Sequence, residues 1–149
     1  MANLREKDII EILKKLRIQT NIFCSVLFND DGLIIAIDQA HFVYDEDNFL
    51  SFSAISASIV ALVENEINSI KKNHTMRSIS IQAGKQIDSD SFIIINQSIT
   101  KNIKISIIFP TNLNLGLIKF ELNQTVKKLE SYFESCEQIK ITNNIKTII

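Results

Sequence analysis

A tight turn between two apolar runs is the sequence feature that most constrains the fold. Residues 29–32 read Asn-Asp-Asp-Gly, and they separate NIFCSVLF at 21–28 from LIIAID at 33–38. Asn and Asp adopt turn conformations readily, and Gly supplies the positive φ that closes a hairpin with a bulge. The first run is rich in β-branched and aromatic residues, which predicts a buried strand. The sequence therefore predicts a β-hairpin whose turn depends on Asp31 and Gly32.

Amphipathic periodicity predicts three helices around the strands. Residues 6–18 and 115–136 repeat apolar side chains at three- and four-residue intervals, and residues 49–71 do so over a longer stretch. Residues 137–149 alternate too weakly to be assigned. We therefore expect a single domain over residues 1–136, followed by a C-terminal tail at 137–149.

The helix predicted at 49–71 has apolar or small residues on two sides. Its large apolar side chains spread over one broad face: Phe52, Ile55, Ile59, Leu62, Val63 and Ile70. Its small side chains cluster on roughly the opposite face: Ala54, Ala57, Ser58 and Ala61. A solvated helix would carry Lys and Glu at such positions, so we expect the first four turns to be covered on both sides.

Three further strands are predicted, at 77–83, 91–99 and 102–109. The links between them carry turn residues and are short, which implies antiparallel neighbours. The strand at 91–99 has apolar side chains on both faces, so it should be central, with helices above and below. Pro110 ends the last strand because it has no N–H to donate. The predicted order is α-β-β-α-β-β-β-α.

The net charge and the hydropathy pattern of the chain argue against some classes of binding partner. The formal net charge is −1, whereas nucleic acids and anionic membranes attract concentrated positive charge. No uninterrupted apolar run approaches the ~20 residues that cross a bilayer. The charged N-terminus lacks the form of a signal peptide. We therefore expect a cytoplasmic protein with no nucleic-acid partner and no membrane insertion.

The titratable residues form no recognisable catalytic or metal-binding pattern. His41 and His74 have no HxH or HxxxH spacing, so both are expected at the surface. Asp30 and Asp31 form an acid pair, but turn formation already accounts for both.

The cysteines and glycines also form no recognisable catalytic or phosphate-binding pattern. Cys24 falls inside an apolar strand with no visible base beside it, where cysteine behaves as a small hydrophobe. Cys136 lies near the end of the last predicted helix, where exposure alone gives no catalysis. The three glycines, Gly32, Gly84 and Gly116, are too far apart to form a phosphate-binding loop. We expect no catalytic residue, no metal and no cofactor.

Three stretches together resemble the roadblock/dynein light chain family. Residues 26–36 are similar to the family's hairpin of strand, Asp-Gly-Leu and strand. Residues 53–64, rich in Ala and Ser, resemble its long central helix, and residues 112–118 resemble the start of its final helix. The likeness covers about residues 5–135. The departures are a long polar insert after the second strand, the link at 84–90 and the extra C-terminal tail.

The resemblance implies a three-layer αβα sandwich of the α/β (α+β) class, with a five-stranded antiparallel sheet in the order 2-1-5-4-3. The central helix would cover one face and the two terminal helices the other. Members of the family pair through the third strand and the central helix, and an uncovered strand edge favours such pairing. The resulting candidate dimer interface comprises Ala54, Ala57, Ser58, Ala61, Arg77, Ser78, Ile79, Ser80, Ile81 and Gln82.

The resemblance also implies a function. Family members are non-enzymatic platforms for small Ras-like GTPases, dynein intermediate chain or lysosomal signalling complexes. We expect a homodimer, or a dimer with a paralogous roadblock chain, that scaffolds or regulates a small Ras-like GTPase. Arg77 at the start of the edge strand invites an arginine-finger interpretation, but a charge that discourages uncontrolled edge pairing is favoured. The alternative is a small-ligand sensor or a profilin-like cytoskeletal binding module, and a polar pocket between central helix and sheet would favour the sensor.

Overall fold

The computed structural model describes residues 4–40, 46–84 and 91–148. Three helices and five strands follow one another in the predicted order. The elements are α1 (Leu4–Thr20), β1 (Cys24–Asn29), β2 (Ile34–Gln39), α2 (Glu46–Ile70), β3 (Ser78–Ala83), β4 (Phe92–Ser98), β5 (Ile103–Pro110) and α3 (Leu115–Ile148).

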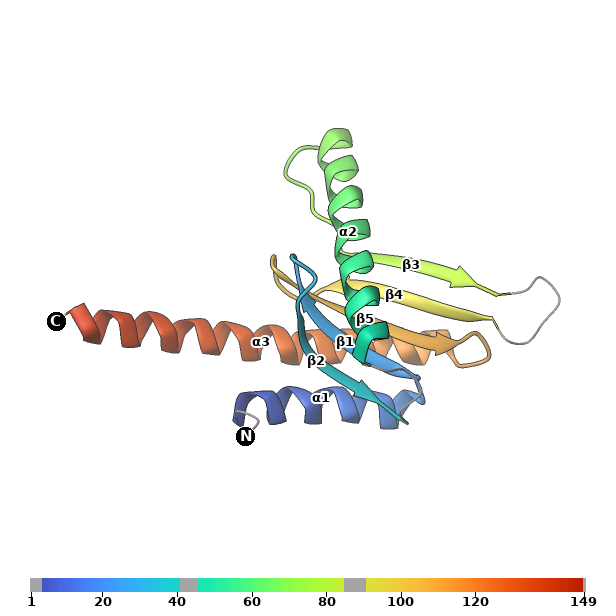
Figure 1. Cartoon of the computed structure of the whole chain (residues 1–149), viewed down its shortest axis with the longest axis horizontal. Coiled ribbons are helices and arrows are strands. Elements are labelled where there is room, and N and C mark those ends of the chain that lie inside the picture. Colours follow the sequence, from blue (N-terminus) through green and yellow to red (C-terminus); the bar gives the residue numbers. More distant parts are fainter. Residues whose placement is uncertain (1–3, 41–45, 85–90, 149) are drawn as a thin grey trace.

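The strands form one antiparallel sheet in the order β2-β1-β5-β4-β3, which confirms the predicted topology. α1 and α3 pack side by side against one face, and α2 crosses the opposite face (Figure 1). β3 lies at one edge and β4 is internal, as the sequence predicts. The molecule is therefore a three-layer αβα sandwich.

The central strands bury side chains on both faces of the sheet because each face is covered by a helix layer. On β1, Leu27 joins the larger core under α1 and α3, whereas Val26 and Phe28 face α2. On β5, Ile105 and Ile107 extend the larger core and are fully buried. This two-sided burial explains the nearly continuous apolar runs in the sequence.

The β1–β2 turn is built by Asn29 and Gly32. The side-chain Oδ1 of Asn29 accepts hydrogen bonds from the backbone N–H groups of Asp31 (3.0 Å) and Leu33 (2.9 Å). Gly32 has φ 79°, which confirms the predicted positive φ, and its N–H donates to the Asn29 carbonyl (3.0 Å). A register shift beside the turn marks a bulge. The predicted hairpin is thus confirmed.

An ion pair fixes α1 to the sheet. Arg17 Nε lies 2.7 Å from Asp38 Oδ2, and Asp38 is buried on β2. The guanidinium also reaches the second carboxylate oxygen (3.4 Å). Such fork-like pairing holds the end of α1 in a defined orientation.

α3 extends beyond the sheet at the C-terminal end (Figure 1). Its helix runs to Ile148, through most of the 137–149 segment that was expected to be a separate tail. The helix is therefore longer than the weak sequence pattern indicates. The division between a domain ending at 136 and a tail stays a prediction.

Candidate protein interface

The outer edge of the sheet is β3, which pairs on one side with β4. Its residues alternate between exposed and half-buried along the whole strand. Ile81 pairs with Ile94, which lines a cavity beneath α2, so Ile79 and Ile81 point toward the α2 side. Ser78 and Ser80 point to the α3 side, where they face a different cavity. β3 therefore has one apolar face and one polar face.

α2 contacts the sheet through a narrow face of mostly small residues. Ser53, Ser56, Ala57 and Val60 are buried, and Phe49 is buried one turn earlier. Ala57 packs with the β1 side chains of the smaller core. This spacing of three and four residues marks the contact face of a helix, and the apolar pattern of the sequence did not single it out.

Gly32 allows α2 to come this close. A Cβ on Gly32 would lie 2.9 Å from the Cα of Ala54, too close for any side chain at this position. Ser53 Oγ donates a hydrogen bond to the Gly32 carbonyl (2.8 Å). The turn glycine therefore has two roles, because it adopts positive φ and it seats the central helix.

The sequence predicts that α2 is covered on both sides. Within the described residues of the single chain, only its contact face is covered. Ala57 is buried against its own sheet, whereas Ala54, Ser58 and Ala61 are exposed. Among the large apolar residues, Ile55 is 57% exposed and Leu62 is 66% exposed. The small residues flank the contact face instead of lying opposite it. Whether they meet another chain stays a prediction.

The large apolar side of α2 reaches the sheet at Phe52. Phe52 lines a cavity of about 370 Å³ together with Phe92 and Ile94 of β4 and Ile108 of β5. Ala54 lies on the other flank, over the β1–β2 turn. We call the flank formed by Phe52, Ile55, Ile59, Leu62 and Val63 the apolar flank of α2. It lies on the same side of the sheet as the apolar face of β3.

By length and composition α2 could also cross a membrane, although no uninterrupted apolar run predicts this. The segment Asp47–Ile70 is 24 residues long, and only 22% of its most apolar part is buried. A core helix of a soluble protein can be as long and as apolar, but it is mostly buried. The low buried fraction means that much apolar surface on α2 has no cover within the described chain.

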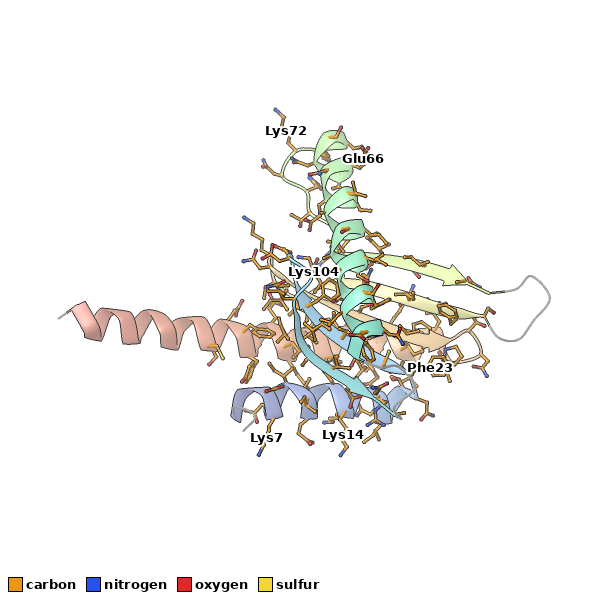
Figure 2. All side chains as sticks on the ribbon, in the orientation of Figure 1. Lys7, Lys14, Phe23, Glu66, Lys72 and Lys104 are labelled. Carbon is orange, nitrogen blue, oxygen red and sulfur yellow. The ribbon has the colours of Figure 1, made fainter. Side chains whose placement is uncertain are left out.

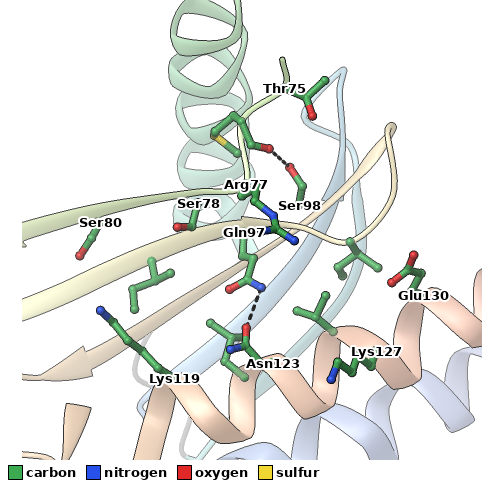
Figure 3. A pocket seen from close by; sticks show the side chains of 15 residues that line it. Thr75, Arg77, Ser78, Ser80, Gln97, Ser98, Lys119, Asn123, Lys127 and Glu130 are labelled. Carbon is green, nitrogen blue, oxygen red and sulfur yellow. Dashed lines mark hydrogen bonds between the residues drawn. The ribbon is translucent and has the colours of Figure 1, made fainter. Parts of the chain in front are cut away.

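The polar residues of the predicted interface lie on or beside the edge strand. They are Arg77, Ser78, Ser80 and Gln82. Arg77 precedes β3, and its carbonyl accepts a hydrogen bond from the Ser98 N–H (3.0 Å). Its side chain lines the cavity on the α3 side of the sheet, away from α2 (Figure 3). The structure thus places Ile79 and Ile81 on the α2 side of the sheet and turns Arg77 and the serines to the opposite face.

The candidate catalytic residues remain scattered. His74 Nδ1 lies 3.1 Å from the Lys72 carbonyl at the exposed end of α2, and His41 lies outside the described residues. Burial raises the pKa of the Cys24 thiol from 9.0 to about 12, and the carboxylate of Asp38 adds to the effect. A thiol with so high a pKa is a poor nucleophile. Within the described ranges no three His, Cys, Asp or Glu residues lie together as metal ligands.

A buried lysine joins the two hairpin turns at one end of the sheet, and no sequence pattern indicated it. Lys104 is 1% exposed, and Figure 2 shows it in the region where α2 crosses the sheet. Its Nζ lies 2.7 Å from the Lys101 carbonyl and 3.3 Å from Asp30 Oδ1. Asp30 therefore does more than form a turn, because its carboxylate balances a buried charge.

Two polar side chains lie buried on the α2 side without a partner in the described part of the chain. Asn96 of β4 and Ser106 of β5 are opposite each other in the sheet, and each is 1% exposed. Neither amide atom of Asn96 nor Ser106 Oγ makes a hydrogen bond among the described residues. Both could have been recognised in the sequence as polar residues inside apolar strands.

The fold can be compared with proteins of known structure. MglB from Myxococcus xanthus superposes with a TM-score of 0.75 at 16% identity, covering 91% of this chain and 94% of that chain. The chain has the roadblock fold. The gliding protein MglB from Thermus thermophilus gives a TM-score of 0.76 at 12% identity, over 91% and 95% of the two chains.

A domain described by that name is also similar. The Roadblock/LC7 domain from Streptomyces avermitilis gives a TM-score of 0.68 at 13% identity, over 84% of this chain and 97% of that domain. No family model matches the sequence, and no curated protein matches it either. The roadblock likeness predicted from three sequence stretches is thus confirmed at the level of fold.

Proposed function

We propose that this roadblock chain is a non-enzymatic homodimeric platform that binds a small Ras-like GTPase in the cytoplasm. The observation that carries the proposal is the position of two uncovered surfaces on one side of the molecule. The outer edge of β3 bears Ile79 and Ile81 on its α2 side, and the apolar flank of α2 lies on the same side of the sheet. A second copy would cover both surfaces at once.

Two-fold symmetry suits this arrangement. Antiparallel pairing of β3 with its copy would satisfy the outward N–H and C=O groups of both edges. It would also bring the two α2 helices together along their apolar flanks. An interface that joins strand edges and helices in this way buries on the order of 2,000 Å² in total, as obligate dimers do.

The GTPase partner is proposed from the family that the sequence resembles. One structure with the same fold is described as MglB with a tetrameric arrangement, so a chain of this fold assembles further. In the proposed dimer, two helices and a continuous sheet offer a wide surface for the switch regions of a GTPase. The mechanism would be steric and conformational.

The dimer is tested with two adjacent residues on different flanks of α2. Leu62 lies on the apolar flank and Ala61 lies on the small-residue side, and both are exposed in the single chain. We expect Leu62→Arg to raise the dimer dissociation constant at least about a hundredfold, because it places a charge in a desolvated contact. Ala61→Arg should have a much smaller effect. Light scattering across a concentration series measures both.

The outcomes separate the rival interfaces. Dissociation by Ala61→Arg alone would instead support the small-residue strip of Ala54, Ser58 and Ala61 as the contact. A wild-type protein that is monomeric at about 50 µM, well above the usual dissociation constants of such dimers, would refute the homodimer. Co-sedimentation with liposomes that Leu62→Arg abolishes would assign the apolar flank to a membrane.

The GTPase part of the proposal is tested with the wild-type protein. Chromatography of the wild-type protein with Ras-like GTPases from its own source organism, loaded with a non-hydrolysable GTP analogue, should give a complex that the GDP-loaded forms lack. A dimer that binds none of them would leave the scaffold without its proposed partner and would refute that part of the proposal.

A further inference from the structure

A second site lies on the opposite face of the sheet, between α3 and the strands β3 and β4. The cavity there has a volume of about 720 Å³, which is the size of small-molecule sites in other proteins. On the β3 side its wall includes the short polar side chains of Ser78 and Ser80. The cavity is present in the single chain.

The floor of this cavity is apolar. Ile95 of β4, Ile99 after it, and Leu122 and Val126 of α3 line the cavity and are themselves at least nine-tenths buried. These side chains expose little surface themselves, so the gain from this floor comes mainly from removing the apolar surface of the ligand from water, at roughly 25 cal/mol per Å².

The rim of the cavity is cationic. Arg77 comes from the segment before β3, and Lys119 and Lys127 come from α3 (Figure 3). Glu130 is the single carboxylate among the described lining residues, so the titratable groups of the site sum to a positive charge. The salt bridges formed by the described residues are Arg17–Asp38 and Lys104–Asp30, and neither involves these cations.

Polar groups that can orient a ligand lie between floor and rim. Gln97 Nε2 donates to Asn123 Oδ1 (3.1 Å), and this bond spans from the sheet to α3 (Figure 3). The two amides have further donors and acceptors that a ligand in the cavity can use. The hydroxyls of Ser78 and Ser80 add donors on the strand side.

We propose that this cavity binds a small organic anion, with its charged head between Arg77, Lys119 and Lys127 and its apolar body against Ile95 and Leu122. Arginine binds a carboxylate or phosphate head through two parallel hydrogen bonds. An apolar floor with a few convergent polar groups is the usual form of a small-molecule site. A ligand here would bridge β3, the proposed dimer edge, to α3.

The test uses two dyes that differ in charge. The probe 8-anilinonaphthalene-1-sulfonate carries an anionic head on an aromatic body, and N-phenyl-1-naphthylamine has the same rings without the sulfonate. We expect the double variant Arg77→Gln/Lys119→Gln to weaken binding of the anionic dye at least about tenfold, because two of the three cations are lost. Binding of the neutral dye should change less than about twofold, since its contact is with the apolar floor.

A matched control removes the same charge elsewhere. Lys71→Gln/Lys72→Gln neutralises two exposed cations at the end of α2 and should leave anionic-dye binding close to that of the wild type. Amide chemical shifts should move mainly at 76–80, 95–99 and 119–130. Phenyl phosphate or octanoate should displace the dye, and the stronger competitor identifies the preferred head group.

Three results would overturn the proposal. They are equal losses in the two double variants, shift changes centred on residues 50–62, or a dye that neither competitor displaces. Light scattering on the same samples reports the oligomeric state separately. A monomer that binds the anionic dye as described would refute the dimer and leave this site standing.

Discussion

At the scale of single residues, Gly32 is the position where the sequence is most constrained. Its φ of 79° suits glycine, and a Cβ would lie 2.9 Å from the Ala54 Cα. The turn pattern predicted the positive φ. It could not predict the close approach of α2, because that contact joins residues far apart in the sequence.

Gly32→Val should therefore lower the free energy of unfolding by more than about 1 kcal/mol, since strain and steric overlap add. Gly116→Ala is the control, because Gly116 lies in the first turn of α3 near only a side-chain oxygen of Asn114. Denaturant unfolding of both variants checks the prediction. Equal stability of Gly32→Val and the wild type would contradict both roles of this glycine.

The ionisation of the Cys24 thiol makes the free energy of unfolding depend on pH in the alkaline range. In the unfolded chain its thiol has an ordinary pKa of 9.0, and in the fold burial raises this pKa to about 12. The folded state therefore keeps a proton that the unfolded state loses, so this contribution to stability is full below pH 9 and falls as pH rises toward 12.

Cys24→Ala should remove this slope. The difference in unfolding free energy between wild type and variant should shrink by about 1 kcal/mol from about pH 9 to about pH 10. Guanidinium unfolding at several pH values across this range measures it, with Cys136→Ala as the control. Parallel pH profiles for wild type and Cys24→Ala would show that the thiol is solvated in the folded state.

At the scale of elements, α2 rests partly on polar atoms that have no partner in the described part of the chain. Ser106 Oγ is buried on the face that α2 covers and makes no hydrogen bond with any described residue. A buried hydroxyl of this kind costs about 1–3 kcal/mol in lost hydration. The contact between α2 and the sheet is therefore weaker than its burial alone indicates.

Ser106→Ala should raise the free energy of unfolding by about 1 kcal/mol, because it removes the unpaired hydroxyl and little volume. Thermal unfolding gives the sign directly. The comparison is Ser53→Ala, which removes a hydroxyl that donates to the Gly32 carbonyl and should destabilise the fold. A loss of stability in Ser106→Ala would mean that its hydroxyl is satisfied in solution.

The sequence patterns predicted the order of the helices and strands, but not the full length of α3 or which face of α2 is the contact face. The large residues of α2 dominate the apolar pattern, so they marked the apparent core side. The structure places Ser53, Ser56 and Ala57 there instead, because α2 must come close to the β1–β2 turn. Small residues carry little hydropathy, and a contact set by close approach is therefore weak in the sequence pattern.

At the scale of the whole molecule, both candidate sites depend on residues that the sheet brings together. Arg77 and Lys119 are far apart in the sequence, and they line one cavity because α3 packs against the sheet beside the strand that follows Arg77. The sequence predicted the order of these strands through its resemblance to a family. It contained no local motif for the anion site, since no two of its three cations are neighbours in the chain.

The alternating faces of β3 also restrict how two copies can meet. Isoleucines point to one side of the strand and serines to the other. Sliding the partner strand by one residue would reverse its faces, so the whole second molecule would have to turn over, with its α2 beneath the sheet. Only shifts by two residues keep the α2 helices of both copies on the same side of the joined sheet. The two different faces of β3 therefore exclude a partner that pairs in the inverted orientation, whatever the fit of its individual side chains.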